Sequence, residues 1–207
     1  MSDLAILGAG KLGTTVARLA RSQGLAVDVA RSGDPASIRL IVEVLAPGAR
    51  AVAPPEAIAG AEMVMLALPL SKYPSLDADA LAGKLVIDAM NYWWEVDGRD
   101  TELAHAEPSS SEVVGSFLAG STLVKAFNHI GYHDLADQAR PVGTPGRVAM
   151  ALAGDDAAAR HRVAELVDRL GFDPVELPTL HAGKALEPGH PAFGAALPAD
   201  ELDVLLR

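Results

Sequence analysis

A glycine-rich segment near the start of the chain limits the fold more than any other feature. Residues 3–7 (DLAIL) form a short apolar run, and residues 8–13 (GAGKLG) follow it directly. Residues 10–22 then place apolar side chains at the spacing of one helical face. A G-x-G-x-x-G sequence between a buried strand and a helix is typical of the loop that binds a dinucleotide pyrophosphate. The alternative is a glycine-rich turn without a ligand.

Each glycine of this loop has its own reason to lack a side chain. Gly8 permits the tight turn, Gly10 lets a pyrophosphate approach the backbone, and Gly13 lets the helix pack close to the strand. The first N–H groups of the helix carry partial positive charge, which favours an anion. We therefore predict that a dinucleotide contacts Gly8, Ala9, Gly10, Lys11, Leu12 and Gly13.

Short apolar runs alternate with helical segments along the rest of the chain. This order predicts an α/β fold with a doubly wound, mostly parallel sheet of Rossmann type. Residues 178–207 are rich in Pro, Gly and His and have weak periodicity. We predict a Rossmann domain over residues 1–177 and a small C-terminal extension over 178–207 that contributes to a substrate cleft. The expected strands are residues 3–7, 26–30, 50–53, 63–68, 85–88, 123–127, 148–153 and 174–177.

The end of the second expected strand indicates which dinucleotide is bound. In NAD-binding proteins an acidic residue about 20 positions after the glycines holds the ribose 2′-hydroxyl. This chain has Arg31 and Ser32 there, and Asp28 lies too early, inside the strand. A guanidinium and a hydroxyl can bind a 2′-phosphate, which a carboxylate would repel. The sequence thus predicts NADP(H) rather than NAD, with a solvated arginine and a turn serine as the alternative.

Composition argues against several other classes of function. The formal net charge is −10 and the pI is near 4.9, so nucleic acid is not expected as a partner. The chain has no Cys, which excludes disulfides, thiolate catalysis and Cys-based metal sites. No apolar run approaches the roughly 18–20 residues that cross a bilayer, the N-terminus does not read as a signal peptide, and the histidines lack metal-ligand spacing. We expect a cytoplasmic protein with no membrane contact and no bound metal.

Four further segments give the chain a resemblance to a known family. They are LALPL (66–70), VIDAMNYW (86–93), LVKAFN (123–128) and GKALEPGHPAFG (183–194). With the glycine loop, they resemble the NADPH-dependent reductases of the deazaflavin coenzyme F420, the 8-hydroxy-5-deazaflavin:NADP oxidoreductases. The reductase part of membrane ferric reductases is similar too. The resemblance implies hydride transfer between NADP(H) and F420, with the protein orienting the two rings.

The chain departs from that family at three places. A hydroxyl residue often stands where this chain has Ala9, and a Ser-Arg pair where it has Arg31-Ser32. A threonine usually stands where this chain has His129. These differences concern the identity of the hydride acceptor more than that of the dinucleotide.

Three other strand ends are expected to contact the cofactor. Pro69 fixes the backbone after the fourth strand, beside the nicotinamide ribose. Asn91 follows the fifth strand and can hydrogen-bond the ribose or the carboxamide. Lys125, in the sixth strand, is expected to point inward and tether a carbonyl or carboxylate. The predicted cofactor contacts at these ends are Leu68, Pro69, Leu70, Met90, Asn91, Ala126 and Asn128.

Three residues are predicted on the substrate side. Trp93 belongs to a run of three adjacent aromatics, on one of which a flat ring could pack, although core or interface packing is the alternative. His129 could supply a proton as a catalytic group, since a histidine pKa lies in the working range, and a solvated histidine is the alternative. Pro188 is placed there by the resemblance of the C-terminal segment.

Two other functions remain open from the sequence. The first is NADPH-dependent reduction of a small imine or carbonyl compound, which needs a proton donor such as His129 more than a deazaflavin does. The second is a non-catalytic NADPH-binding protein. The resemblance also implies a homodimer, for which the apolar residues 202–206 (LDVLL) are a candidate contact.

Overall fold

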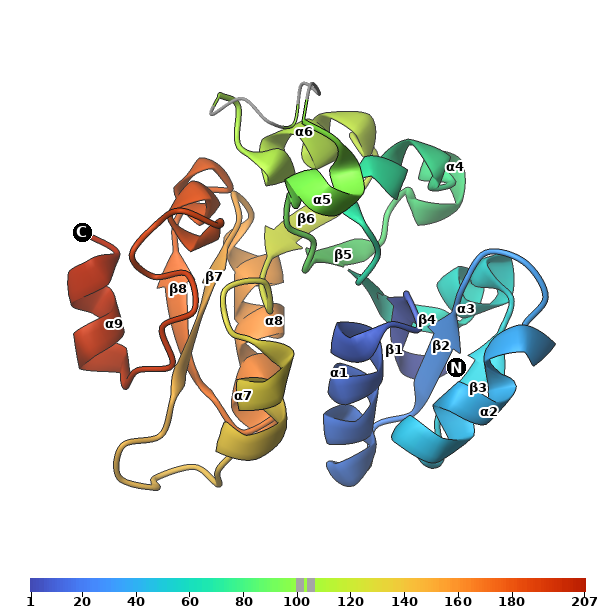
Figure 1. The fold of residues 1–207 in the computed structure, drawn as a ribbon, viewed down its shortest axis with the longest axis horizontal. Helices are drawn as coiled ribbons and strands as arrows, with labels where there is room; N and C mark the ends of the chain where they lie inside the picture. The colour runs from blue at the N-terminus through green and yellow to red at the C-terminus, as the bar shows by residue number, and fades with distance from the viewer. Residues whose placement is uncertain (100–102, 104–106) are drawn as a thin grey trace.

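The computed structural model describes residues 1–99, 103 and 107–207, and its strands form one continuous sheet (Figure 1). The order across the described sheet is β3-β2-β1-β4-β5-β6-β7-β8. The strands are β1 (Ser2–Leu7), β2 (Val27–Ala30), β3 (Arg50–Val52), β4 (Ala61–Leu66), β5 (Leu85–Asp88), β6 (Thr122–Lys125), β7 (Ala149–Ala153) and β8 (Asp173–Leu177).

The six strands from β3 to β6 run parallel, which confirms the predicted Rossmann-type fold. β7 then pairs antiparallel with β6 through a single register pair, Lys125 opposite Ala153, and β8 lies parallel to β7. The order in which strands are added reverses between β1 and β4. β2 and β3 lie on one side of β1, and after β3 the chain crosses back to place β4 on the other side. The connections after β1 and β4 therefore leave in opposite directions, and folds of this type bind ligands at the carboxyl ends of these two strands.

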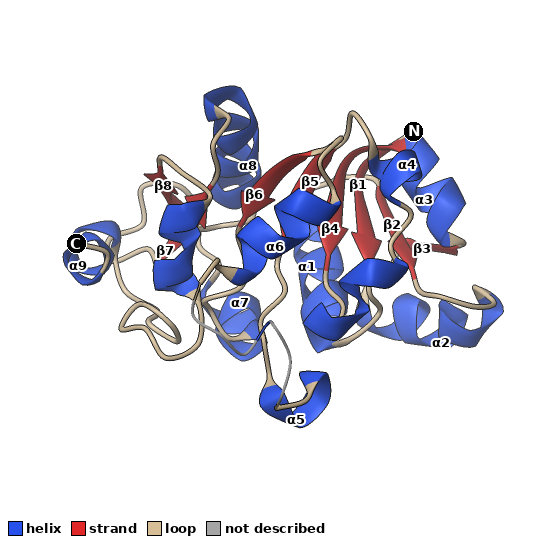
Figure 2. Ribbon diagram, turned by 90° about the horizontal axis from the view of Figure 1, so that it is seen from above, coloured by secondary structure: helices blue, strands red, loops and turns tan. Residues whose placement is uncertain are grey.

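Helices cover both faces of the strand layer, as Figure 2 shows. One apolar core contains side chains of α1, α2 and α8, and a second contains side chains of α3, α4 and α6. The α-helices are α1 (Lys11–Ser22), α2 (Ala36–Leu45), α3 (Pro54–Gly60), α4 (Ala78–Leu81), α5 (Trp94–Asp97), α6 (Ser110–Phe117), α7 (Tyr132–Gln138), α8 (Ala157–Arg169) and α9 (Ala199–Leu205), with 3-10 helices η1 (Leu70–Ser75) and η3 (His181–Leu186).

Element boundaries differ from the sequence prediction mainly where the chain leaves a strand. β4 ends at Leu66, two residues before the expected end, and η1 begins at Leu70 directly after Pro69. The segment after β5 contains α5, and Asp97 anchors it by accepting hydrogen bonds from Ser71 N and Trp93 N, both at 2.8 Å. α7 was not predicted.

The C-terminal residues pack on the outer strands of the same sheet. Leu186, Ala192 and Leu202 are buried against Ala149 and Ala151 of β7. Leu202 is therefore part of this chain's own core. Of the predicted dimer contact at residues 202–206, Leu202 is thus used within the chain, whereas Val204 is 69% exposed, and the dimer stays a prediction.

Candidate dinucleotide site

A cavity of about 580 Å³ opens at the carboxyl ends of β1, β2 and β4. Its size lies within the range of small-molecule and cofactor sites. Seven of the predicted cofactor residues line it: Gly8, Ala9, Gly10, Arg31, Ser32, Leu68 and Pro69. These residues come from three chain segments that only the parallel sheet brings together.

The glycine loop has the geometry that the G-x-G-x-x-G sequence requires. Gly8 adopts φ +139°, and a Cβ there would stand 2.0 Å from Ala67 O. A Cβ on Gly13 would stand 2.0 Å from Gly8 O. A Cβ on Gly10, in contrast, would meet no described protein atom within 4 Å. The protein itself thus needs glycine at Gly8 and Gly13, whereas the space beside Gly10 is open.

The first turn of α1 presents free backbone donors at the loop. Gly10 is the N-cap residue, and no described side chain caps it or adds negative charge to the first turn. The first N–H groups of a helix have no partner within the helix, so they attract an anion. The residues present therefore fit the pyrophosphate of a dinucleotide.

The polar side chains that line the cavity are Arg31, Ser32, Lys72, Ser75 and Asp77. Arg31 and Ser32 follow β2 as predicted, and Lys72 enters from η1. Arg31 and Lys72 are both exposed, so they offer two positive charges with little cost of desolvation. Sequence reasoning missed Lys72, because nothing in the sequence shows that η1 lines the same cavity as the residues after β2.

Other predicted cofactor residues lie away from this cavity. The Leu70, Met90 and Ala126 side chains are buried in the core, so only their backbone could reach a ligand. Lys11 lies on the exposed start of α1, where its Nζ donates to Tyr132 Oη at 3.1 Å. The Leu12 side chain packs on the core.

Asn91 and Asn128 bridge the ends of β5 and β6. Asn91 Nδ2 donates to Asn128 O (2.7 Å), while Asn128 Nδ2 donates to Asn91 Oδ1 (3.1 Å) and to Leu186 O (2.6 Å). Asn128 is 4% exposed, and its Oδ1 has no partner among the described residues. A buried, unpartnered acceptor beside a partly exposed amide is a place where a ligand donor would be stabilised.

A buried ionic cluster around Lys125 lies near the two asparagines. Lys125 is fully buried, with Nζ 3.6 Å from Asp88 Oδ2 and 3.8 Å from Glu187 Oε1, and it donates to Met90 O (3.2 Å). The expectation that Lys125 points inward and tethers a carbonyl or carboxylate is confirmed. Glu187 also accepts from Ser110 N (2.9 Å), so the cluster joins β5, β6, α6 and the C-terminal segment.

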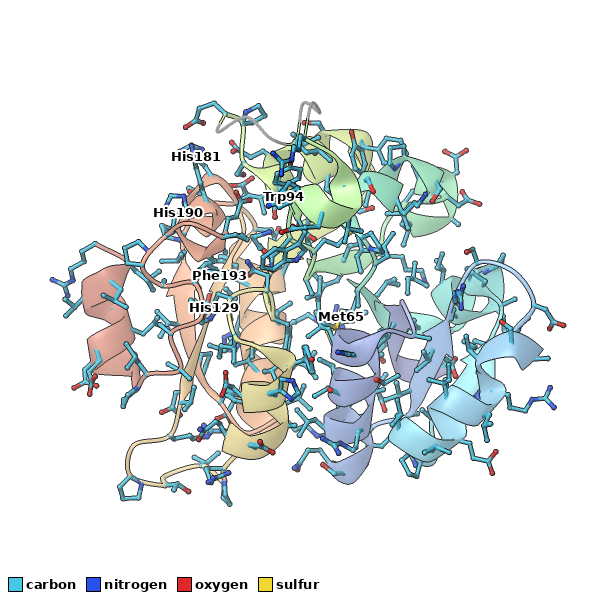
Figure 3. All side chains as sticks on the ribbon, viewed as in Figure 1. Met65, Trp94, His129, His181, His190 and Phe193 are labelled. Atoms are coloured by element: carbon cyan, nitrogen blue, oxygen red, sulfur yellow. The ribbon has the colours of Figure 1, made fainter. Side chains whose placement is uncertain are left out.

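His129, the predicted proton donor, is buried in the structure. Its side chain is 1% exposed, and Nε2 accepts a hydrogen bond from Ala151 N (2.9 Å). Burial lowers the pKa of His129 from its ordinary 6.5 to about 4. A hydrogen bond with the backbone of Ala192 acts in the opposite direction but is the smaller effect. Figure 3 shows the residue near Phe193, on whose segment Gly194 N donates to His129 O (2.7 Å). The neutral ring joins β7 to the C-terminal segment, and we assign it no proton transfer.

The two remaining substrate-side predictions lie on this C-terminal segment and on the loop that faces it. Trp93 is 46% exposed and meets Phe193 edge to face, with ring centroids 5.7 Å apart. Pro188 follows Glu187 of the ionic cluster and is half-buried. Neighbouring Trp94 is covered by Arg99, whose guanidinium carbon lies 3.9 Å from the ring centroid. An aromatic surface thus adjoins the ends of β5 and β6.

The described part of the chain lacks two further features. No three His, Asp or Glu side chains there are grouped so that they could hold a metal ion. No described helix has the length and apolar character needed to cross a membrane. The fold, the glycine loop and the cavity define a Rossmann-type dinucleotide-binding protein.

Comparisons with known sequences agree with this class. Residues 3–92 match the family model described as NADP oxidoreductase coenzyme F420-dependent. Over 134 residues, or 64% of this chain, the sequence is 31% identical to metalloreductase STEAP3 of Rattus norvegicus. The chain spans about a quarter (25%) of that protein's length.

Solved structures extend the likeness to the whole chain. The hypothetical protein SMa0349 from Sinorhizobium meliloti has a TM-score of 0.80 and 31% identity, with 97% of each chain covered. A provisionally assigned F420-dependent NADP-reductase from Arthrobacter sp. FB24 has a TM-score of 0.69 and 22% identity, with 90% of each chain covered. The chain belongs to one family with the Sinorhizobium protein, and together the matches support an NADP-dependent oxidoreductase.

Proposed function

We propose that this protein transfers a hydride between NADP(H) and a deazaflavin coenzyme, F420. The family model matched by residues 3–92 describes F420-dependent NADP oxidoreductases, and the cavity at those residues fits the adenosine half of a dinucleotide. In this proposal NADPH supplies the hydride and the chain's own residues bind and orient the two partners.

The adenosine half is held by the glycine loop and by the cations beyond β2. The pyrophosphate takes the free N–H groups at the start of α1, beside Gly10. The 2′-phosphate lies among Arg31, Ser32 and Lys72, which line one part of the same cavity. Two cations and a hydroxyl favour the doubly charged phosphate over a bare ribose hydroxyl, which supports NADP(H) over NAD.

The nicotinamide half extends toward the ends of β4, β5 and β6. Leu68 and Pro69 already line the cavity on that side. Asn91 and Asn128 then present amide groups fixed by each other and by Leu186 O. Because these side chains hold one another, they need little rearrangement when the ring arrives, which is the main way such proteins accelerate hydride transfer.

The state of His129 is the observation that favours a deazaflavin over an imine or carbonyl compound. Reduction of those compounds needs a proton donor at the reacting atom, and His129, the expected donor, is buried and neutral. Hydride transfer to a flat ring depends more on position than on a protein acid. Trp93 offers a partly exposed aromatic face for that ring, and half-buried Pro188 is the other predicted contact.

One observation keeps the imine or carbonyl reductase as the second candidate. Tyr132 Oη accepts from Lys11 Nζ (3.1 Å) at the first turn of α1, so a phenol stands near the glycine loop. A phenol held by a lysine can donate a proton. In that alternative Tyr132→Phe abolishes turnover, whereas in the deazaflavin proposal it leaves most of the activity.

The direct test mixes the protein with NADPH and purified F420 and follows the visible absorbance of the deazaflavin. Bleaching that depends on the protein and is retained by Tyr132→Phe supports the proposal. NADPH binding without bleaching overturns it. Turnover of an imine or carbonyl panel would then identify the second candidate, and no turnover at all would identify a non-catalytic NADPH-binding protein.

A further inference from the structure

The dinucleotide cavity has an apolar part that the expected phosphate contacts leave unused. It is lined by Pro54, Pro55 and Ile58 of α3, by Leu76, which follows η1, and by Ala80 of α4, and we call these five residues the apolar end. α3 and α4 are in contact, and Ile58, Leu76 and Ala80 belong to the same apolar core. A wall of this kind suits an uncharged, flat ring.

The topology of the sheet sets the apolar end beside the predicted 2′-phosphate contacts. β2 and β3 are parallel neighbours, so their carboxyl ends meet at one edge of the sheet. Arg31 and Ser32 follow β2, and Pro54 lies two residues after the end of β3. All three residues line the same cavity. A ribose whose 2′-phosphate lies at Arg31 is therefore expected to direct its base toward the apolar end.

The start of α3 lacks the donors that the start of α1 offers to a phosphate. Pro54 and Pro55 occupy the first two positions of α3, and proline has no N–H group. Glu56 adds a negative charge to the same turn. The first turn of α1, in contrast, presents free N–H groups beside Gly10. The cavity thus differs in chemistry between the glycine loop, which fits a pyrophosphate, and the apolar end, which fits a base.

Asp77 supplies an acceptor at the apolar end. It is the N-cap residue of α4, and its Oδ1 accepts a hydrogen bond from Ala80 N (2.9 Å). Its Oδ2 accepts no hydrogen bond from the described residues, and its carboxylate forms no ion pair with them. The neighbouring Ser75 hydroxyl already donates to Lys72 O (2.7 Å). Since a carboxylate is an acceptor only, Oδ2 selects a ligand group that donates.

We propose that Asp77 determines which base the bound dinucleotide carries, because its Oδ2 accepts a hydrogen bond from the 6-amino group of adenine while the ring packs on the apolar end. A purine with a carbonyl at position 6 sets two acceptors against each other, so the site disfavours it. The inference rests on the proposed binding of NADP(H). It does not depend on which acceptor receives the hydride.

The helix cap makes Asp77→Asn a sharp test of this role. Ala80 N needs an oxygen acceptor, and asparagine has only one side-chain oxygen, so that oxygen stays in the cap and Nδ2 takes the place of Oδ2. Asparagine caps a helix as well as aspartate does, so the melting temperature should stay within error of the wild type. The group that meets the base then changes from an acceptor to a donor.

Isothermal titration with NADPH and with its hypoxanthine analogue, which has a carbonyl in place of the 6-amino group, measures the preference. We expect the wild type to bind NADPH on the order of tenfold more tightly than the analogue. Asp77→Asn should bind the analogue at least as tightly as NADPH. Asp79→Asn is the matched control, because Asp79 is an exposed aspartate of α4 that does not line the cavity, and it keeps the wild-type ratio.

The ratio of the two Kd values separates base recognition from a general effect of charge. Both dinucleotides carry the 2′-phosphate, so Arg31→Ala weakens both alike and leaves the ratio unchanged. Equal binding of the two dinucleotides by the wild type, or an equal change of both Kd values in Asp77→Asn, overturns the role of Asp77 and leaves the deazaflavin assay unaffected. The expected ratios without bleaching of F420 support the role of Asp77 and overturn only the deazaflavin as acceptor.

Discussion

Asn91 and Asn128 hold each other across the ends of β5 and β6 through two hydrogen bonds of 2.7 and 3.1 Å. Each residue supplies one donor and one acceptor to the pair, and Asn128 continues to Leu186 O in the C-terminal segment (2.6 Å). The predicted nicotinamide contacts thus form a fixed unit before any ligand binds.

Loss of this pair is expected to affect turnover more than binding. Asn91→Ala removes one partner, so Asn128 keeps only its bond to Leu186 and can change orientation. We expect kcat with NADPH and F420 to fall on the order of tenfold or more, because small misplacements at a reacting centre are costly. The affinity for 2′,5′-ADP, which occupies only the adenosine half, stays unchanged. A variant that loses 2′,5′-ADP binding while keeping kcat would contradict the assignment.

The glycine loop gives a prediction that separates folding from binding. In Gly10→Ala the new Cβ meets no described protein atom within 4 Å, so the melting temperature stays within error of the wild type. The same Cβ occupies the space expected for the pyrophosphate, and we expect NADPH affinity to fall on the order of tenfold, or about 1.4 kcal/mol.

Two further glycine variants control this experiment. Gly60→Ala also adds a Cβ with no described neighbour within 4 Å, but away from the cavity, and should change neither property. Gly13→Ala drives its Cβ to 2.0 Å from Gly8 O and destabilises the fold by about 1–3 kcal/mol. Normal NADPH affinity in Gly10→Ala would contradict the placement of the pyrophosphate.

Arg31 and Lys72 are expected to determine the preference for the 2′-phosphate. A charge-assisted hydrogen bond contributes about 1.5–3 kcal/mol, so Arg31→Ala should weaken NADPH binding by roughly ten- to a hundredfold. NADH binding should change little, because NADH lacks the phosphate. Lys72→Ala acts in the same direction. Isothermal titration with both dinucleotides measures the ratio, and Arg18→Ala, an exposed arginine on α1 outside the cavity, is the control.

His129 predicts how stability depends on pH. Its folded-state pKa of about 4 lies below the ordinary 6.5, so below pH 6.5 the unfolded chain binds a proton that the folded chain does not. The free energy of unfolding therefore falls as the pH drops from about 6.5 to 4, by about 3 kcal/mol from this residue alone, and this loss levels off below pH 4.

Urea unfolding at pH 7 and pH 4 measures this dependence. The variant His129→Asn lacks the titrating group, so its unfolding free energy should fall by about 3 kcal/mol less than that of the wild type between the two pH values. His190→Asn is the control, because His190 lies on the C-terminal segment that packs beside His129 and is only half-buried. Equal pH slopes for wild type and His129→Asn would contradict the buried neutral state.

Local sequence was enough to predict the strand–glycine–helix unit, the mostly parallel sheet and the residues at the end of β2. These features depend on neighbouring positions: the spacing of apolar side chains, the conformational freedom of Gly8 and the place of Arg31 after an apolar run. The inward direction of Lys125 followed from alternation along one strand. Each of these needs no knowledge of distant parts of the chain.

Tertiary structure alone decided the roles of His129, Lys72 and Leu202. His129 looked like a loop residue, but β7 and the segment near Ala192, more than 20 and 60 positions away in the chain, enclose its ring and hold it neutral. Lys72 lines the same cavity as Arg31 although the two lie 41 positions apart, and Leu202 enters the core because α9 packs on β7. Burial and charge state depend on which distant segments pack together, and the spacing of residues along one chain does not contain that information.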